Sequence, residues 1–246
     1  MRIHFQAALR LPFAGSGWPR RFAIGAATTL GCEALFAALG YLASGEAGLG
    51  LIPLAAAVNF PLLGYALEVF RGGLIGDPGK LPEWEGWPGL TFRGLLLALV
   101  GLGYGLVPLL MLLAGLNFLV RGGIMLSMAV ALIVLGLAAA LSVLFFLPMG
   151  VARYLAEERI EAAFRPAILW AAIARVLPEY VAAYACAVGL FVVAGVVASM
   201  PFAGPLITPI LAYYFCVVQA RLTGEVCGRA LFAPPSPSAA PEAGPG

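Results

Sequence analysis

The sequence predicts an all-α, polytopic integral membrane protein with six transmembrane helices. Composition is the first reason: 62% of the 246 residues are hydrophobic and 11% are charged, and the mean hydropathy is +0.99. Soluble domains carry about 25% charged residues, and a soluble chain this apolar would expose large oily patches. The second reason is a series of apolar runs of about 20 residues, the length that crosses a bilayer as a helix. The third is a one-sided distribution of Lys and Arg around these runs.

Each apolar run is expected to be a helix, because a backbone surrounded by hydrocarbon has to satisfy its own hydrogen bonds. A transmembrane β-barrel would instead show short segments of alternating polarity. The expected spans cover residues 22–43, 49–70, 91–113, 124–148, 178–200 and 205–223. Together they form one membrane domain, residues 1–233, followed by a Pro- and Ala-rich tail, residues 234–246, that we expect to be disordered.

Two amphipathic segments accompany the spans. Residues 1–19 mix apolar and basic side chains and are expected to lie at the membrane surface. In residues 150–177, apolar side chains such as Leu155 and Phe164 recur at helical spacing opposite charged ones. Pro166 is expected to divide this segment into two helices. In the simpler interpretation, this segment is a helix that lies in the cytoplasmic interface of the membrane. In the alternative, more specific interpretation, it is a coupling helix that binds a partner protein.

The orientation follows from the basic residues. Of the 14 Lys and Arg residues, Arg121 alone falls on the second side of a six-span topology. Cytoplasmic loops of membrane proteins carry the excess of Lys and Arg. We therefore expect a multi-pass protein of the cytoplasmic (plasma) membrane with both termini in the cytoplasm.

The spans also show a weak internal repeat. Leu81-Pro82-Glu83 precedes the third span and Leu177-Pro178-Glu179 precedes the fifth, and both resemble helix starts with Pro in the first turn. The inward-running spans each contain a proline, namely Pro61, Pro148 and Pro209. Three helical hairpins of one ancestry would explain this pattern. The alternative is that these residues are simply frequent in membrane helices.

Glu33 is the most informative single residue, because it lies near the middle of the first span. An ionised carboxylate there costs on the order of 2.5–3.5 kcal/mol. Counting from the helix ends places Asn59, Tyr104 and Tyr213 at a similar depth. A polar belt of this kind predicts a proton- or cation-coupled site at the midplane. The alternative is a protonated Glu33 that hydrogen-bonds Asn59 and holds two helices together.

A cytoplasmic interaction surface is the second candidate site. Its residues come from the loop 71–90 and the segment 150–177, and they are Arg71, Glu83, Trp84, Arg153, Glu157, Glu158 and Arg165. The alternative for the loop is that its tryptophans lie at the headgroup level and its acids cap the next helix. Glu68 and Arg71 are expected to form an ordinary pair at a helix end.

The sequence contains few of the residue combinations that catalytic sites require. The only histidine is His4, so a histidine-based metal site or a Ser-His dyad is not expected. The only aspartate is Asp77, which excludes a paired-aspartate protease. There is no phosphate-binding loop of P-loop form, no basic run suited to nucleic acid, and no CxxC spacing among the four cysteines. We expect no enzyme activity, no cofactor, no metal and no nucleic-acid partner.

A set of short motifs runs along nearly the whole chain. Its members include Ala8-Leu9-Arg10-Leu11-Pro12-Phe13, Arg20-Arg21, Leu63-Gly64-Tyr65, Leu81-Pro82-Glu83-Trp84, Arg93-Gly94-Leu95, Tyr104, Pro148-Met149, Ala152-Arg153-Tyr154, Glu157-Glu158, Ala162-Ala163-Phe164, Tyr180 and Gly224. In order and spacing they resemble the bacterial and archaeal membrane-protein family known as Domain of Unknown Function 4013. The resemblance implies a polytopic helical membrane protein and supplies no reaction, substrate or ligand. The Pro-rich tail departs from the family pattern.

Two function classes remain. We expect a non-enzymatic membrane component that scaffolds a membrane or cytoplasmic protein partner through its cytoplasmic loops. The alternative is a small transporter or channel that uses the Glu33 level. One form of this alternative is an ABC-type permease subunit, since Glu161-Ala162-Ala163 followed by Leu177-Pro178 resembles its coupling loop. The interval is short, however, and Ala167 stands near the expected glycine. The sequence leaves the oligomeric state open.

Overall fold

The protein is all-helical throughout the part of the chain that its computed structural model describes, residues 5–42, 57–77, 80–123 and 125–232. The elements in chain order are α1 (Phe5–Arg10), η1 (Leu11–Phe13), α2 (Trp18–Leu42), α4 (Phe60–Leu74), α5 (Trp87–Arg121), α6 (Met125–Glu157), η3 (Ile160–Phe164), α7 (Pro166–Arg175), α8 (Leu177–Ala198) and α9 (Gly204–Phe232). The expected tail, residues 234–246, lies outside the described residues.

Five of these helices, α2, α5, α6, α8 and α9, are long and apolar enough to cross a membrane, as judged by length and composition. They match five of the six expected spans and identify a multi-pass membrane protein. The expected span 49–70 begins outside the described residues, and its described part is residues 57–59 and the start of α4. A sixth span therefore stays a prediction.

The hairpin of α5 and α6 is longer than expected. At 35 and 33 residues, the two helices measure about 52 and 50 Å, against a hydrocarbon core about 30 Å thick. α6 continues to Glu157, so the segment that we expected to begin a surface helix at residue 150 first extends α6. The helix ends at Glu157, and the next residue, Glu158, adopts a left-handed φ of 54°. Pro166 then begins α7, as expected.

The two Leu-Pro-Glu motifs have different local structures. Leu177-Pro178 begins α8 with the proline in its first turn. Leu81-Pro82-Glu83 instead lies in a non-helical loop, and α5 begins only at Trp87 with Pro88 in its first turn. The expectation of a helix start at Leu81 was therefore wrong, because the next Trp-Pro pair supplies that signal. The two motifs therefore do not support the predicted repeat of helical hairpins, because only Leu177-Pro178 begins a helix.

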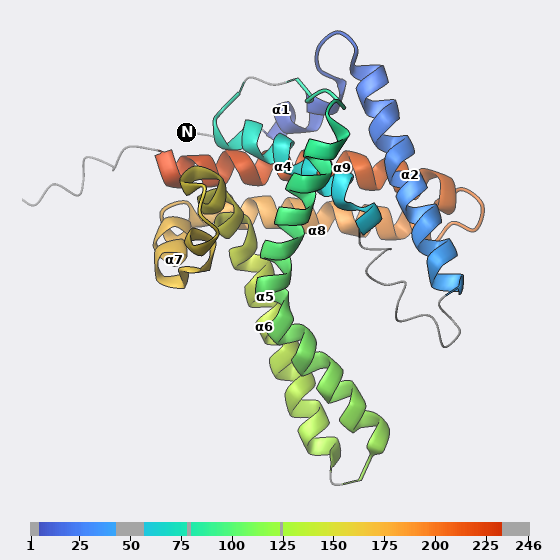
Figure 1. The fold of residues 1–246 in the computed structure, drawn as a ribbon, viewed down its shortest axis with the longest axis vertical. Coiled ribbons are helices and arrows are strands. Elements are labelled where there is room, and N and C mark those ends of the chain that lie inside the picture. Colours follow the sequence, from blue (N-terminus) through green and yellow to red (C-terminus); the bar gives the residue numbers. More distant parts are fainter. Residues whose placement is uncertain (1–4, 43–56, 78–79, 124, 233–246) are drawn as a thin grey trace, which may run out of the picture.

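The arrangement of the helices differs from a parallel six-helix bundle. Figure 1 shows the α5–α6 hairpin running down the page and away from the remaining helices, whereas α8 and α9 run across it. α4 packs against both α5 and α9. The core is formed where these helices meet, and its buried residues include Met149, Ala152, Ile173, Tyr180 and Cys227.

Glycines bring α4 close to both neighbours. A Cβ at Gly64 would collide with the Leu90 carbonyl oxygen of α5, and one at Gly224 of α9 would collide with the Phe70 carbonyl oxygen of α4. Small residues allow helix backbones to approach this closely in membranes. The position of α4 therefore depends on glycines, and α4 in turn positions the polar side chains described next.

Candidate functional site

A buried aromatic pair holds the loop between α4 and α5 in place. The rings of Tyr65 on α4 and Trp84 in the loop are stacked, with centroids 3.9 Å apart and planes inclined by 4°. The Tyr65 hydroxyl donates a hydrogen bond of 3.1 Å to the Pro82 carbonyl oxygen. Leu81 beside them is only 1% exposed. Leu81 and Trp84 therefore anchor the loop in the core.

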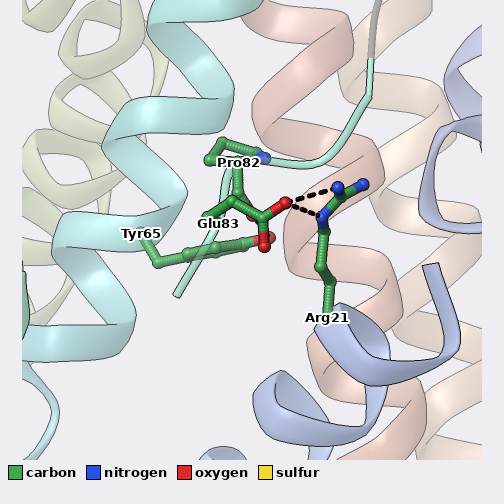
Figure 2. Close-up of polar contacts among 4 residues, drawn as sticks. All are labelled: Arg21, Tyr65, Pro82 and Glu83. Atoms are coloured by element: carbon green, nitrogen blue, oxygen red, sulfur yellow. Dashed lines mark hydrogen bonds and ion pairs between the residues drawn. The ribbon is translucent and has the colours of Figure 1, made fainter. Parts of the chain in front are cut away.

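The same loop is tied to the start of α2 by an ion pair. Arg21 Nε donates to Glu83 Oε1 over 2.8 Å, and Arg21 Nη2 donates to the same oxygen, as Figure 2 shows. The hydrogen bonds from this guanidinium hold the pKa of the Glu83 carboxyl below its usual range. Arg21 is 7% exposed, and its Nη1 has no hydrogen-bond partner among the described residues.

A cavity of about 370 Å³ lies next to this ion pair, and we name it the basic pocket. Helix α4, the loop, η1 and α9 contribute its lining: Leu11, Glu68, Val69, Arg71, Gly72, Ile75, Asp77, Lys80, Leu81, Pro82, Glu83 and Arg221. Three cationic side chains, Arg71, Lys80 and Arg221, reach it from three different elements. Its volume falls in the range of about 300–1,000 Å³ that is usual for small-ligand sites.

A second cavity of about 300 Å³, the side groove, lies against the same turn of α4. It shares Glu68 and Arg71 with the basic pocket and adds residues of α5, of α6 and at the end of α6, among them Arg93, Tyr154 and Glu158. Glu68 forms an ion pair with Arg93 of α5. The expected Glu68–Arg71 helix-end pair was therefore wrong, because α5 packs close enough to bring a better-placed cation.

The turn between α6 and α7 carries exposed charges on a fixed backbone. Ala162 and Ala163 of η3 are buried, and the Tyr104 hydroxyl of α5 donates to the Ala163 carbonyl oxygen. The Tyr104 and Phe164 rings stack with centroids 4.8 Å apart. The exposed charged residues of this turn, which we name the η3 surface, are Glu158, Arg159, Glu161 and Arg165.

The residues of the expected interaction surface fall into different places. Arg71 and Glu83 line the basic pocket, and Glu158 lines the side groove. Arg153 and Glu157 form an ion pair along α6, and Arg165 is exposed before α7. Trp84 does not belong to an exposed surface: it is 7% exposed, because its ring stacks on Tyr65 in the core.

The four residues of the expected midplane belt lie in three different surroundings. Glu33 is exposed on α2, and its neighbour Cys32 approaches the Val58 carbonyl oxygen to 3.3 Å, near Asn59. Tyr104 packs against η3. Tyr213 is buried beside Phe22, with centroids 5.4 Å apart. Tyr104 lies at the middle of α5 (Trp87–Arg121), and a common depth of the four residues in the bilayer stays a prediction.

The structure adds Arg21, Tyr65 and Arg221, which we had not counted among the candidate site residues. Their positions depend on contacts between segments up to 144 residues apart, such as the bond from Arg221 to the Asp77 carbonyl oxygen. Arg21 and Tyr65 had one signal in the sequence, their presence in the family motifs, and Arg221 had none. Among the described residues, no group of three or more His, Cys, Asp or Glu side chains is placed to hold a metal ion.

A family model described as Protein of unknown function (DUF4013) matches residues 48–203, which is more than half of the chain. The chain belongs to this family. The search of curated proteins and the search of solved structures gave no match. The resemblance noted in the sequence is confirmed, although the matched range excludes the motifs at residues 8–21 and Gly224.

In this DUF4013 protein, the motif residues that lie far apart in the sequence meet in space. Tyr65, Pro82 and Trp84 form the contacts that hold the loop, and the Tyr104–Ala163 bond holds η3. Gly64 permits the close approach of α4 and α5. These motif residues therefore form a structural framework, whereas charged residues outside the motifs, such as Arg159 and Arg165, are exposed and can contact other molecules.

Proposed function

We propose that this DUF4013 protein is a non-enzymatic membrane component that binds a partner protein at the η3 surface, on the cytoplasmic side of the membrane. The partner is inferred to carry a segment of mixed charge, because the η3 surface presents two acids and two arginines, Glu158, Glu161, Arg159 and Arg165. One-sided placement of Lys and Arg supports the cytoplasmic orientation.

The observation that carries this proposal is the fixed backbone under exposed charges. The buried Ala162 and Ala163, together with the Tyr104 hydrogen bond, hold η3 against α5 and α6. A surface that is already ordered loses less conformational entropy when a partner binds. Complementary charges then add selectivity and a faster association rate more than affinity.

The test is site-specific crosslinking in native membranes. A photoreactive amino acid at Arg159 should give a protein adduct of discrete mass, and the double variant Glu161→Lys, Arg165→Glu should abolish it. The matched control places the same probe at Arg121, at the far end of the α5–α6 hairpin. An adduct that survives the charge reversal, or that forms equally at residue 121, would contradict docking at the η3 surface.

Transport through Glu33 is the second candidate, and one observation favours it. Glu33 is exposed on α2 among exposed apolar neighbours such as Leu30 and Phe36. A carboxylate facing lipid at mid-span is costly, so a water-filled path or a second protein chain at this face would explain its position. In proteoliposomes, Glu33→Gln should then abolish a proton-dependent flux. A chain that carries no flux in any imposed gradient would exclude this role.

A further inference from the structure

The basic pocket brings together three cations that the chain holds far apart. Arg71 lies on α4, Lys80 in the loop and Arg221 on α9, and all three line one cavity of about 370 Å³. Arg71 and Lys80 are exposed, whereas Arg221 is half-buried. Neither the partner surface at η3 nor the Glu33 site includes these residues, so the pocket is a separate feature of the molecule.

Arg221 is held in a defined position within the pocket. Its Nη2 donates to the Asp77 carbonyl oxygen. A Cβ added at Gly72 would lie 3.5 Å from Arg221 Nη1, which shows that the guanidinium runs along the surface of α4 at a glycine. A cation held in this way loses little freedom when it contacts an anion.

The acids of the pocket leave a positive excess. Glu68 and Glu83 also line it, but they pair with Arg93 and Arg21, which lie outside the lining. Each of these two ion pairs is neutral. The charges that remain are the three cations of the lining and the Asp77 carboxylate, which sum to +2. The carbonyl groups at the end of α4 add little negative potential, because the N–H groups of Ile75, Gly76 and Asp77 bond to them.

A further unused donor lies beside the pocket wall. Arg21 Nη1 is buried without a hydrogen-bond partner among the described residues. A Cβ added at Gly15 would lie 3.9 Å from this nitrogen and 3.5 Å from the Lys80 Cβ, so the nitrogen is close to a residue of the lining. Buried donors normally have acceptors, and an anion next to Lys80 would supply one.

The pocket is also partly apolar. Leu11, Ile75, Leu81 and Pro82 contribute to its lining, and Ile75 is 67% exposed. Arg71 and Arg221 stand at the expected cytoplasmic ends of their spans, where the headgroups of the bilayer begin. Cationic side chains beside an apolar surface at the depth of the lipid headgroups favour the binding of an anion that also carries an apolar part.

We propose that the basic pocket binds a phosphate-bearing anion through Arg71, Lys80 and Arg221. The phosphate oxygens accept hydrogen bonds from the two guanidinium groups and the ammonium group, which are the usual partners of phosphate. The phosphodiester of an anionic lipid headgroup and free phosphate share this chemistry. Ile75, which is 67% exposed, offers the acyl chains of the lipid form an apolar contact at the edge of the pocket.

Lipid titration of the full chain tests the proposal. The purified protein, stripped of lipid in detergent, is titrated with phosphatidylglycerol, and the bound lipid is counted by native mass spectrometry. Arg71→Gln and Lys80→Gln should each weaken binding about five- to tenfold, the loss expected for one charged contact. Arg175→Gln is the matched control, since it removes one exposed cation outside the pocket.

Two further arms identify the source of the phosphate. In the first, inorganic phosphate replaces the lipid, and stabilisation against heating that Arg71→Gln removes shows that the pocket takes free phosphate. In the second, a neutral diacylglycerol shows whether acyl chains alone bind. Phosphatidylglycerol binding without any response to inorganic phosphate assigns the site to a headgroup. Either result supports the proposed chemistry.

Three outcomes would overturn it. If Arg175→Gln weakens phosphatidylglycerol binding as much as Arg71→Gln does, the lipid is held by the general positive surface. If diacylglycerol binds as tightly as phosphatidylglycerol, the phosphate makes no contribution. If neither phosphatidylglycerol nor inorganic phosphate distinguishes the wild type from Arg71→Gln and Lys80→Gln, the pocket binds no phosphate. Each variant's thermal unfolding is measured without ligand, so that a folding defect is recognised separately.

Discussion

At the scale of single residues, the loop between α4 and α5 depends on Tyr65 and on the Arg21–Glu83 ion pair. Tyr65 contributes a ring that stacks on Trp84 and a hydroxyl that bonds to the Pro82 carbonyl oxygen. Glu83 connects the loop to a helix 62 residues earlier in the sequence. These contacts are local in space and distant in sequence, so their loss should affect the whole arrangement around the basic pocket.

The Arg21–Glu83 pair should make stability depend on pH. The pKa of Glu83 in the folded protein is lowered from 4.5 by the hydrogen bonds from Arg21. The ionised Glu83 therefore contributes its full stabilisation above pH 4.5, the pKa of the unfolded state. That stabilisation is lost as the pH falls through the lower pKa of Glu83 in the folded protein. The difference in thermal unfolding temperature between wild type and Glu83→Gln should shrink over that window. Glu85→Gln, in the same loop, should keep the wild-type pH dependence.

Tyr65 should show separable effects of its hydroxyl and its ring. Tyr65→Phe removes the bond to Pro82 and should lower the free energy of unfolding by about 1 kcal/mol. Tyr65→Leu also removes the stacking on Trp84 and should cost about 1 kcal/mol more. Unfolding by denaturant in detergent, followed by tryptophan fluorescence, measures both. Equal stability of Tyr65→Phe and Tyr65→Leu would show that the stacking contributes nothing.

At the scale of helices, glycines decide how closely α4 approaches α5 and α9. The backbone of α5 passes Gly64, and the backbone of α4 passes Gly224 of α9, with no room for a Cβ at either position. Other glycines of the same helices, such as Gly101 on α5, face open space. The same residue type therefore has two roles, and only packing distinguishes them.

Gly64→Ala should destabilise the protein by about 3 kcal/mol or more, because the added methyl meets backbone that cannot move without shifting a helix. Gly101→Ala should leave stability within about 1 kcal/mol of wild type, since alanine has the higher helix propensity and meets no neighbour. The two variants are compared by unfolding in detergent. A smaller loss for Gly64→Ala than for Gly101→Ala would contradict the close contact of α4 and α5.

At the scale of the whole molecule, the α5–α6 hairpin is the least supported by the rest of the protein. Figure 1 shows its far half extending beyond the other helices. Large apolar side chains are exposed along this half, including Val107, Leu110, Val130 and Leu141. Between Arg93 and Arg153 the only charged residue is Arg121. A helix pair that is apolar on all sides is stable in hydrocarbon and not at a water interface.

We therefore predict that the hairpin crosses the bilayer and that Arg121 lies on the side opposite η3. A cysteine at residue 121 should react with a membrane-impermeant thiol reagent from outside intact cells, and a cysteine at residue 165 should react only after the membrane is opened. The chain without an added cysteine gives the background. Labelling of both positions from the same side would mean that the hairpin does not cross.

The sequence by itself determined the membrane class, the family and the approximate positions of five spans. These properties depend on runs of about 20 residues, and hydrocarbon imposes a helix on each run separately. Tertiary structure decided which side chains meet: Glu68 pairs with Arg93 instead of Arg71, Trp84 is buried against Tyr65, and Tyr104 contacts η3. These outcomes depend on how closely helices approach at glycines and where long helices end. No short stretch of sequence contains that information, because both partners of each contact have to be placed first.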